Sequence, residues 1–215
     1  MKNMKITHRI LMLGQSALKS YGPSGLKRIL WDNEYSTDKW NFADNTKNDC
    51  VYAHLEKHAC NGSILDLGCG SGNTSNELVT TAYQRYLGVD ISEVGLAKAR
   101  KRSEDNGRGA KNQFVCGDFL QFATAERFDV ILLRESLYHV PIDKIVPMFT
   151  TYGKNLKENG VFVVRLKVLD EKDGTQKARP LAMLAVIERE FNIIEDCYYQ
   201  EFGSTVVVFR PLGKS

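Results

Sequence analysis

A glycine-rich turn that follows an acidic residue is the first feature of this sequence whose residue types and spacing could do chemistry. Asp66 precedes Gly68, Gly70 and Gly72 in the stretch "ILDLGCGSGNTS". Glycine in a tight turn lets the backbone approach a ligand closely. A carboxylate just before such a turn suits a cationic group, such as an ammonium, better than it suits a pyrophosphate. The stretch therefore predicts a ligand-binding turn at the end of a strand.

Two further acidic residues come at the ends of short apolar stretches. Asp90 ends "LGVD" and could accept hydrogen bonds from both hydroxyls of a ribose. Asp118 could accept a hydrogen bond from an adenine amino group, and Phe119 offers a flat apolar surface for the base. An N-cap role for Asp118 and a core position for Phe119 are the structural alternatives. With Asp66, these residues predict one crevice at the carboxyl edge of a parallel sheet.

The spacing of the glycines separates two classes of ligand. A dinucleotide-binding turn needs G-x-G-x-x-G, with its third glycine three residues after the second. Asn73 stands at that position, after Gly68 and Gly70. The pattern therefore argues against a dinucleotide.

A second group of polar residues follows the apolar run 128–133. Glu135 could orient or deprotonate an amine or a hydroxyl, and His139, which ordinarily titrates near neutrality, could serve as a base. The alternative for His139 is packing against, or capping, the helix that follows. Arg134 could bind an acidic group of a substrate or the carboxylate of a cofactor.

A possible metal site precedes the glycine turn. Cys50, His54 and His58 are spaced four apart and would share one face of a helix, with Cys60 close by. No second cluster completes a structural metal site of the usual spacing. We therefore expect a partly exposed helix with incidental histidines, and no bound metal.

Strands and helices alternate after residue 62, which predicts an α/β fold. The expected architecture is a three-layer Rossmann-like sheet of seven strands, mostly parallel, with an antiparallel last strand because the final connection is too short for a parallel crossover. Residues 1–62 should form a helical segment that covers the site, and residues 63–215 the main domain. The expected strands are 63–68, 85–90, 112–117, 128–134, 160–168, 192–200 and 204–210, and the expected helices are 73–82, 93–106, 143–160 and 179–191.

Composition and charge exclude several classes of protein. The net charge of the 215 residues is +3 and the basic residues are scattered, so we expect no nucleic-acid partner. The five cysteines are widely spaced, which is typical of reduced thiols. No apolar run approaches 20 residues and no signal cleavage site follows the N-terminal "MKNMKITHRILMLGQS". We therefore expect a cytoplasmic protein with no membrane partner.

The D-x-G-x-G-x-G pattern resembles motif I of the class I, Rossmann-like S-adenosylmethionine-dependent methyltransferases of the small-molecule type. The resemblance runs from about Trp31 to Pro211 and includes "FDVILLRESLYHVP", "LKENGVFVV" and "STVVVFRP". It also includes an N-terminal W-x-x-E-Y…W element, whose Trp31, Tyr35 and Trp40 are candidates to cover the cofactor. Arg134 and His139 depart from the pattern of the group at positions where the substrate would sit.

This resemblance implies a function and a set of site residues. The function is transfer of a methyl group from S-adenosylmethionine to an oxygen or nitrogen of a small metabolite. A protein-side-chain methyltransferase and a non-catalytic cofactor-binding protein are the alternatives. The implied catalytic residues are Glu135 and His139, and the implied cofactor-binding residues are Asp66, Gly68, Cys69, Gly70, Gly72, Asp90, Ile91, Asp118, Phe119 and Arg134.

Overall fold

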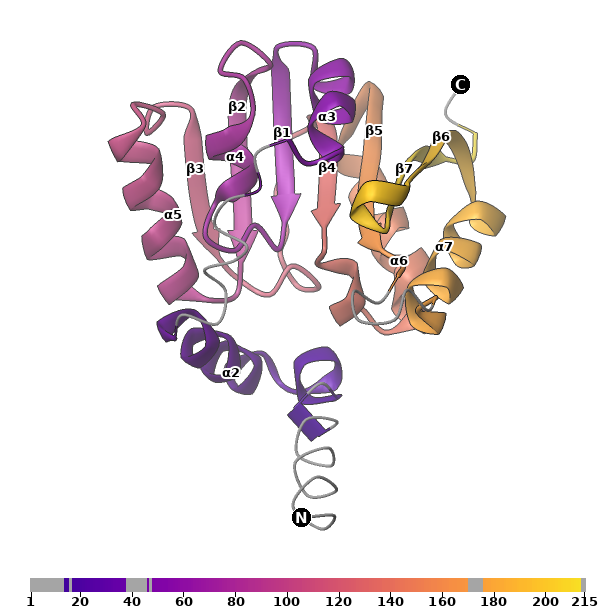
Figure 1. The fold of residues 1–215 in the computed structure, drawn as a ribbon, viewed down its shortest axis with the longest axis horizontal. Helices are drawn as coiled ribbons and strands as arrows, with labels where there is room; N and C mark the ends of the chain where they lie inside the picture. Colours follow the sequence, from indigo (N-terminus) through magenta and orange to yellow (C-terminus); the bar gives the residue numbers. More distant parts are fainter. Residues whose placement is uncertain (1–13, 16, 38–45, 47, 170–175, 214–215) are drawn as a thin grey trace.

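The computed structural model describes residues 14, 15, 17–37, 46, 48–169 and 176–213 (Figure 1). Short helices and strands alternate along most of this length, as expected. The α-helices are α2 Ser24–Ser36, α3 Val51–Ala59, α4 Asn73–Glu77, α5 Glu93–Asp105, α6 Ile142–Tyr152 and α7 Ala178–Glu190. The strands are β1 Gly62–Leu67, β2 Tyr83–Asp90, β3 Asn112–Cys116, β4 Phe128–Arg134, β5 Leu156–Lys167, β6 Phe191–Tyr199 and β7 Ser204–Pro211.

The seven strands form one sheet in the order β3-β2-β1-β4-β5-β7-β6. β1 pairs in parallel with β2 and β4, and β7 pairs antiparallel with both β5 and β6. This confirms the mostly parallel sheet and the antiparallel last strand. The chain order reverses between β1 and β4, and the crevice beyond such a switch point is where α/β sheets bind ligands.

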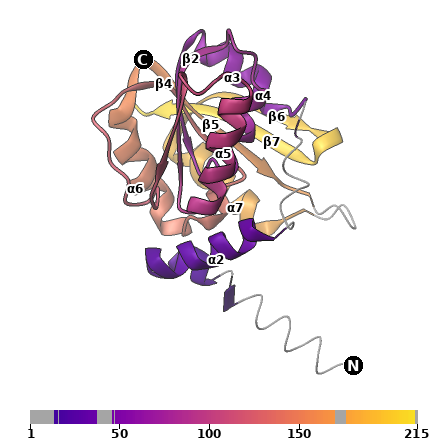
Figure 2. The same ribbon diagram turned by 90° about the vertical axis from the view of Figure 1, so that its left-hand side faces the viewer.

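Helices cover both faces of the sheet because neighbouring residues of a strand point to opposite sides. In β4, Ile131 packs in the core with α6 and α7, whereas Val130 packs in the core with α3. Figure 2 shows the sheet nearly edge-on between these helices. α2 lies beyond the carboxyl ends of the strands (Figure 1), where it contacts α5. The division of the chain near residue 62 stays a prediction, although α3 packs directly on the sheet.

Two helices end earlier than their sequence patterns predict. The expected helix 73–82 stops at Glu77, before the run Val79-Thr80-Thr81, whose branched side chains favour a helix less than Leu or Ala does. The expected helix 143–160 stops at Tyr152, because Leu156 already pairs with Phe128 in the sheet. In both places the rest of the fold overrides local helix propensity.

Three phenylalanine rings pack together where α6 meets the sheet. The ring of Phe149, which is fully buried, lies 4.9 Å from the rings of both Phe162 in β5 and Phe209 in β7. Edge-to-face rings of this kind add to the free energy gained from burial. Phe149 therefore joins a helix to both the parallel and the antiparallel part of the sheet.

The substitution Phe149→Ala should lower the free energy of unfolding by about 3–5 kcal/mol, because it removes a buried ring and leaves a cavity. Urea denaturation measures this change. Val79→Ala, at an exposed position, serves as the control and should change the free energy by less than about 0.5 kcal/mol. Equal effects of the two substitutions would contradict the packing described here.

Candidate active site

The glycine turn after β1 has a backbone that only glycine adopts easily. Gly68, Gly70 and Gly72 have φ angles of 87°, 55° and 76°. The N–H of Gly68 donates to the carbonyl of Val89 at 2.7 Å, which ties the turn to β2. A Cβ atom at position 68 would lie 2.5 Å from the Cβ atom of Ser136. The turn therefore brings β1, β2 and the end of β4 close together.

Asp66 is a buried carboxylate at the end of β1. Its side chain accepts a hydrogen bond from the hydroxyl of Tyr86 through Oδ2. The other oxygen, Oδ1, has no hydrogen-bond partner in the described part of the chain. Burial raises the pKa of Asp66 to about 7, against the lowering effects of Tyr86 and Arg134. A buried carboxylate with an unpartnered oxygen is well suited to a cationic ligand group.

Asp90 joins the end of β2 to the glycine turn. Its Oδ2 accepts the N–H of Gly70 at 2.9 Å, and its Oδ1 accepts the N–H of Ser92 at 2.8 Å. Burial raises the pKa of Asp90 to about 6, although these backbone N–H groups act to lower it. Each carboxylate oxygen has a further lone pair for a ligand hydroxyl. The side chain therefore both shapes the turn and keeps acceptor capacity.

Asp118 contacts α2 in the structure. Its Oδ2 lies 3.0 Å from both the ammonium of Lys27 and the hydroxyl of Ser24. Its Oδ1 accepts the N–H of Leu120 at 3.0 Å, so the residue also caps a turn. Both the capping role and a place beside the crevice are observed. A contact of Asp118 with adenine stays a prediction.

α2 covers the glycine turn. A Cβ atom at Gly70 would lie 2.5 Å from the hydroxyl of Tyr35, and the ring of Tyr35 packs against Gly95 of α5. Trp31 meets the ring of His139 edge to face, with the ring centres 4.8 Å apart. Trp31 and Tyr35 both line the cleft, and their covering of a cofactor stays a prediction. Trp40 lies outside the described residues.

Charged residues of alternating sign form the other end of the site. Arg134 and Arg165 lie 2.8 Å and 3.4 Å from Asp49, and Arg165 also forms an ion pair with Glu135. Burial acts to raise the pKa of Asp49, but the two arginines hold it below its ordinary value. Arg165 and Asp49 were missed in the sequence. The signal for Arg165 was a charged residue inside the apolar strand "GVFVVRLKV".

Glu135 has an uncommon backbone conformation. Its φ angle is 57°, which lies in a backbone region that residues other than Gly, Asn and Asp seldom adopt. Its N–H donates to the carbonyl of Arg165 at 3.0 Å, which holds this conformation. Strain of this kind is found often at functional sites. The conformation presents the Glu135 side chain to the same space as Asp66 and Asp90.

The pKa of His139 is lower than the sequence led us to expect. Burial, with the positive charges of Lys19 and Arg179, lowers its pKa to about 4. The imidazole is therefore neutral at pH 7 and is a weak base. It lies in the short 3₁₀ helix Leu137–His139, against Trp31.

Most of these groups line one cleft of about 880 Å³, a size typical of small-molecule sites. Of the twelve catalytic and cofactor-binding residues that the resemblance implies, Gly72 does not line the cleft. It is the N-cap of α4 and lies against Ala99. The others that line the cleft are Asp66, Gly68, Cys69, Gly70, Asp90, Ile91, Asp118, Phe119, Arg134, Glu135 and His139.

The residues weighed as a metal site in the sequence do not come together as a set. The thiol of Cys50 lies 3.6 Å from Asp49, and Cys60 is exposed. His54 and His58 share one face of α3, as expected, and both contact Glu195 of β6.

No described helix is long and apolar enough to cross a membrane.

The pKa of Asp66 predicts a dependence of stability on pH. The unfolded chain ionises Asp66 near pH 4, whereas the folded chain keeps its proton up to about pH 7, so stability falls as the pH rises between these values. The Asn side chain of Asp66→Asn can still accept the hydrogen bond of Tyr86. The stability of this variant should therefore fall less over this pH range, and at pH 8 it should exceed the stability of the parent.

Urea denaturation of both proteins from pH 4 to pH 8 measures this difference. Asp90, whose pKa is also raised, is present in both proteins, so most of its own contribution cancels, although its charge helps to raise the pKa of Asp66. Identical pH profiles would show that folding leaves the pKa of Asp66 unchanged.

Comparisons with known proteins show that part of this sequence is similar to methyltransferases. Residues 64–160 match the family model for a methyltransferase domain. Ubiquinone biosynthesis O-methyltransferase of Actinobacillus pleuropneumoniae is 42% identical over 82 residues, which are 36% of this chain and 35% of that protein. N-terminal Xaa-Pro-Lys N-methyltransferase 1 of Xenopus tropicalis is 26% identical over 154 residues, covering 63% of this chain and 67% of that protein. This chain therefore spans about a third of the ubiquinone enzyme.

The fold is also that of a solved methyltransferase. The N-methyltransferase NodS of Bradyrhizobium japonicum, in complex with S-adenosyl-l-homocysteine, superposes with a TM-score of 0.64. The two sequences are 20% identical, and the match covers 86% of this chain and 98% of NodS. Residues 64–160 thus resemble a methyltransferase domain in sequence, and the seven-stranded sheet that contains them has the same fold as NodS.

Proposed function

We propose that this protein transfers a methyl group from S-adenosylmethionine to an oxygen or nitrogen of a small molecule. The observation that carries the proposal is the single cleft, which joins the glycine turn and its carboxylates to a second set of charged groups. The first set has the chemistry of a nucleoside and amino-acid site, and the second lies where an acceptor would enter. α2 lies over the cleft, with Lys27, Trp31 and Tyr35 among the lining residues.

The residues present fit S-adenosylmethionine. The unpartnered Oδ1 of Asp66 supplies an acceptor for an ammonium, and Asp90 supplies acceptors for ribose hydroxyls. Phe119 and Ile91 line the cleft as apolar surface for a base, and Arg134 supplies a cation for a carboxylate. When bound, this cofactor contributes a methyl group on a positively charged sulfur, ready for displacement.

The remaining tasks fall to the residues of this chain. An in-line displacement needs an aligned nucleophile and the exclusion of water. Trp31 and Tyr35 of α2 exclude water over the cleft. Glu135 orients the acceptor and takes up its proton, while its ion pair with Arg165 keeps the carboxylate in place. The neutral His139 contributes a surface and a hydrogen-bonding group, and acts as a base only weakly.

A protein acceptor is the second candidate. It is favoured by the similarity to the N-terminal Xaa-Pro-Lys N-methyltransferase of Xenopus tropicalis, which extends over 67% of that protein. A peptide terminus is small enough to enter a cleft of this volume. Release of S-adenosylhomocysteine with small amines and alcohols, compared with Xaa-Pro-Lys peptides, distinguishes the two. No release with any acceptor would favour a non-catalytic cofactor-binding protein.

The substitution Asp90→Ala should weaken binding of S-adenosylmethionine by about 100-fold, since hydrogen bonds to a charged group contribute about 1.5–3 kcal/mol each. Calorimetric titration measures the affinity. Asp105→Ala, at an exposed site on α5, is the matched control and should leave it unchanged. Unchanged affinity in the Asp90 variant would place the ribose elsewhere.

The substitution Glu135→Gln should lower kcat about 100-fold or more, because an amide cannot take up the proton of the acceptor. The affinity for S-adenosylmethionine should stay the same, since Glu135 lies at the acceptor end. Glu104→Gln, an exposed change on α5, is the control. A variant at position 135 with full kcat would remove the base from the proposed mechanism.

A further inference from the structure

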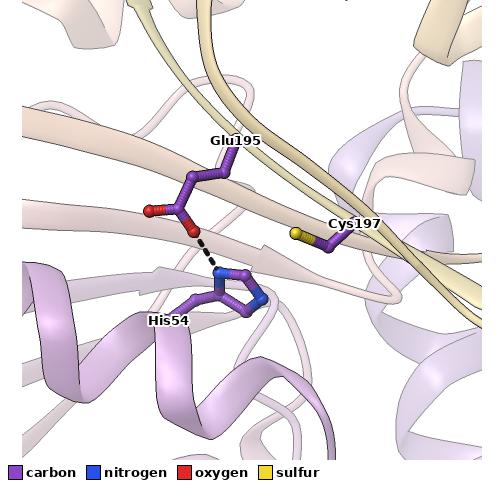
Figure 3. A group of neighbouring side chains, drawn as sticks. All are labelled: His54, Glu195 and Cys197. Atoms are coloured by element: carbon purple, nitrogen blue, oxygen red, sulfur yellow. Dashed lines mark hydrogen bonds and ion pairs between the residues drawn. The ribbon is translucent and has the colours of Figure 1, made fainter.

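A second group of reactive side chains lies outside the cleft, between α3 and β6. Figure 3 shows His54 of α3 facing Glu195 and Cys197 of β6. One nitrogen, one oxygen and one sulfur atom of these residues lie within 4.8 Å of one another. His58, one helical turn after His54, contacts the same carboxylate. None of the four lines the cleft.

The contacts converge on both oxygens of Glu195. His54 Nδ1 lies 2.6 Å from Oε2, and His58 Nε2 lies 2.7 Å from Oε1. The two imidazoles and the carboxylate are each at most 15% exposed. Hydrogen bonds alone explain the contacts between the two histidines and Glu195. They do not explain why the thiol of Cys197 lies beside them, because this thiol has no hydrogen bond among the described residues.

Regular backbone geometry places all four groups on facing surfaces. Residues four apart on a helix share a face, and residues two apart on a strand share a face. His54 and His58 are related in the first way, and Glu195 and Cys197 in the second. The pairing of β6 with β7 shifts register just before Glu195, and such irregularities re-aim side chains.

An outer residue fixes the orientation of the first imidazole. The Nε2 atom of His54 lies 2.8 Å from the hydroxyl of Tyr199, two residues beyond Cys197. Because the Glu195 carboxylate can only accept, Nδ1 carries the proton in this contact. Metal binding at Nδ1 would release that proton, and Nε2–H would then donate to the Tyr199 hydroxyl. Metal-binding histidines are held in the same way, by a second contact to the other ring nitrogen.

We propose that His54, His58, Glu195 and Cys197 bind one divalent metal ion of borderline softness, such as Zn²⁺. Two imidazole nitrogens, a thiolate and a carboxylate are the ligand types that Zn²⁺ takes in tetrahedral sites, whereas Ca²⁺ and Mg²⁺ prefer oxygen alone. This proposal does not depend on the function of the cleft.

The distances require small side-chain movements. Bonds of about 2.0–2.3 Å hold tetrahedral ligand atoms about 3.3–3.8 Å apart. The two nitrogen–oxygen contacts must therefore lengthen by about 0.6 Å. The ligand atoms of His54, Glu195 and Cys197, which lie within 4.8 Å of one another, must draw together by up to about 1 Å, and His58, which lies outside this group of three, must also turn toward the thiol. The ammonium of Lys57 lies 2.6 Å from Oε1 of Glu195, and the side chain is 65% exposed. When the metal binds, this side chain can therefore turn away into solvent. The metal then takes the place of its positive charge.

The expected consequence is a cross-link between α3 and β6. α3 begins two residues after Asp49, the carboxylate that contacts Arg134 and Arg165 in the cleft. A metal bound one turn further along would hold this end of α3 against the sheet. The site is thus placed to stabilise the fold near the cleft without contributing a group to it.

Cobalt titration of the tag-free, reduced protein tests the proposal. Co²⁺ should bind in one equivalent, with visible bands of a tetrahedral site and a near-ultraviolet thiolate-to-cobalt band, and Zn²⁺ should displace it. The midpoint of thermal unfolding should rise by about 5 °C or more in saturating Zn²⁺. Cys197→Ser should lose the near-ultraviolet band, and Cys60→Ser, at an exposed thiol, should keep it.

A second variant separates loss of binding from loss of folding. His58→Gln should weaken Co²⁺ binding at least about 10-fold, while its unfolding midpoint without metal stays close to that of the parent. The proposal is overturned if Co²⁺ gives no tetrahedral bands and Zn²⁺ no rise in the midpoint. It is also overturned if Cys197→Ser keeps the near-ultraviolet band, since another cysteine would then bind the metal.

Discussion

The hydrogen bond from Gly70 N–H to the carboxylate of Asp90 is the contact on which the site depends. It joins the turn after β1 to the end of β2 at 2.9 Å, inside the protein. The turn can make it only because Gly68, Gly70 and Gly72 adopt positive φ angles. A side chain at the first of these would collide with Ser136. The end of β4, and with it Glu135, is thereby placed beside the carboxylates of the first two strands.

The cleft divides into two regions of different electrostatic character. At the glycine turn, Asp66 and Asp90 are buried carboxylates with raised pKa values, which a cationic ligand group would lower again. At the other end, the positive charges of Arg134 and Arg165 offset Asp49 and Glu135. The first region suits one ligand of fixed chemistry. The second is a balanced set of charges, which accommodates a polar acceptor and gives less indication of its identity.

Much of this arrangement was predictable from the sequence, because the end of each apolar strand is marked by a charged residue. Asp66, Asp90 and Glu135 were found in this way. The order of strands and helices was predicted from the alternation of their sequence patterns, and the antiparallel last strand from a connection too short for a parallel crossover. Contacts between distant segments were not predictable. The pairing of Lys27 with Asp118, the place of Asp49 and the lowered pKa of His139 all depend on packing that no local pattern records.

Calorimetric titration of the unmodified protein with S-adenosylmethionine, S-adenosylhomocysteine and NAD tests the central claim most directly. The glycine spacing, the unpartnered oxygen of Asp66 and the acceptor capacity of Asp90 predict that the first two bind at one site and that NAD does not. Binding of NAD without binding of S-adenosylmethionine would contradict the account, because it would show that the turn holds a pyrophosphate.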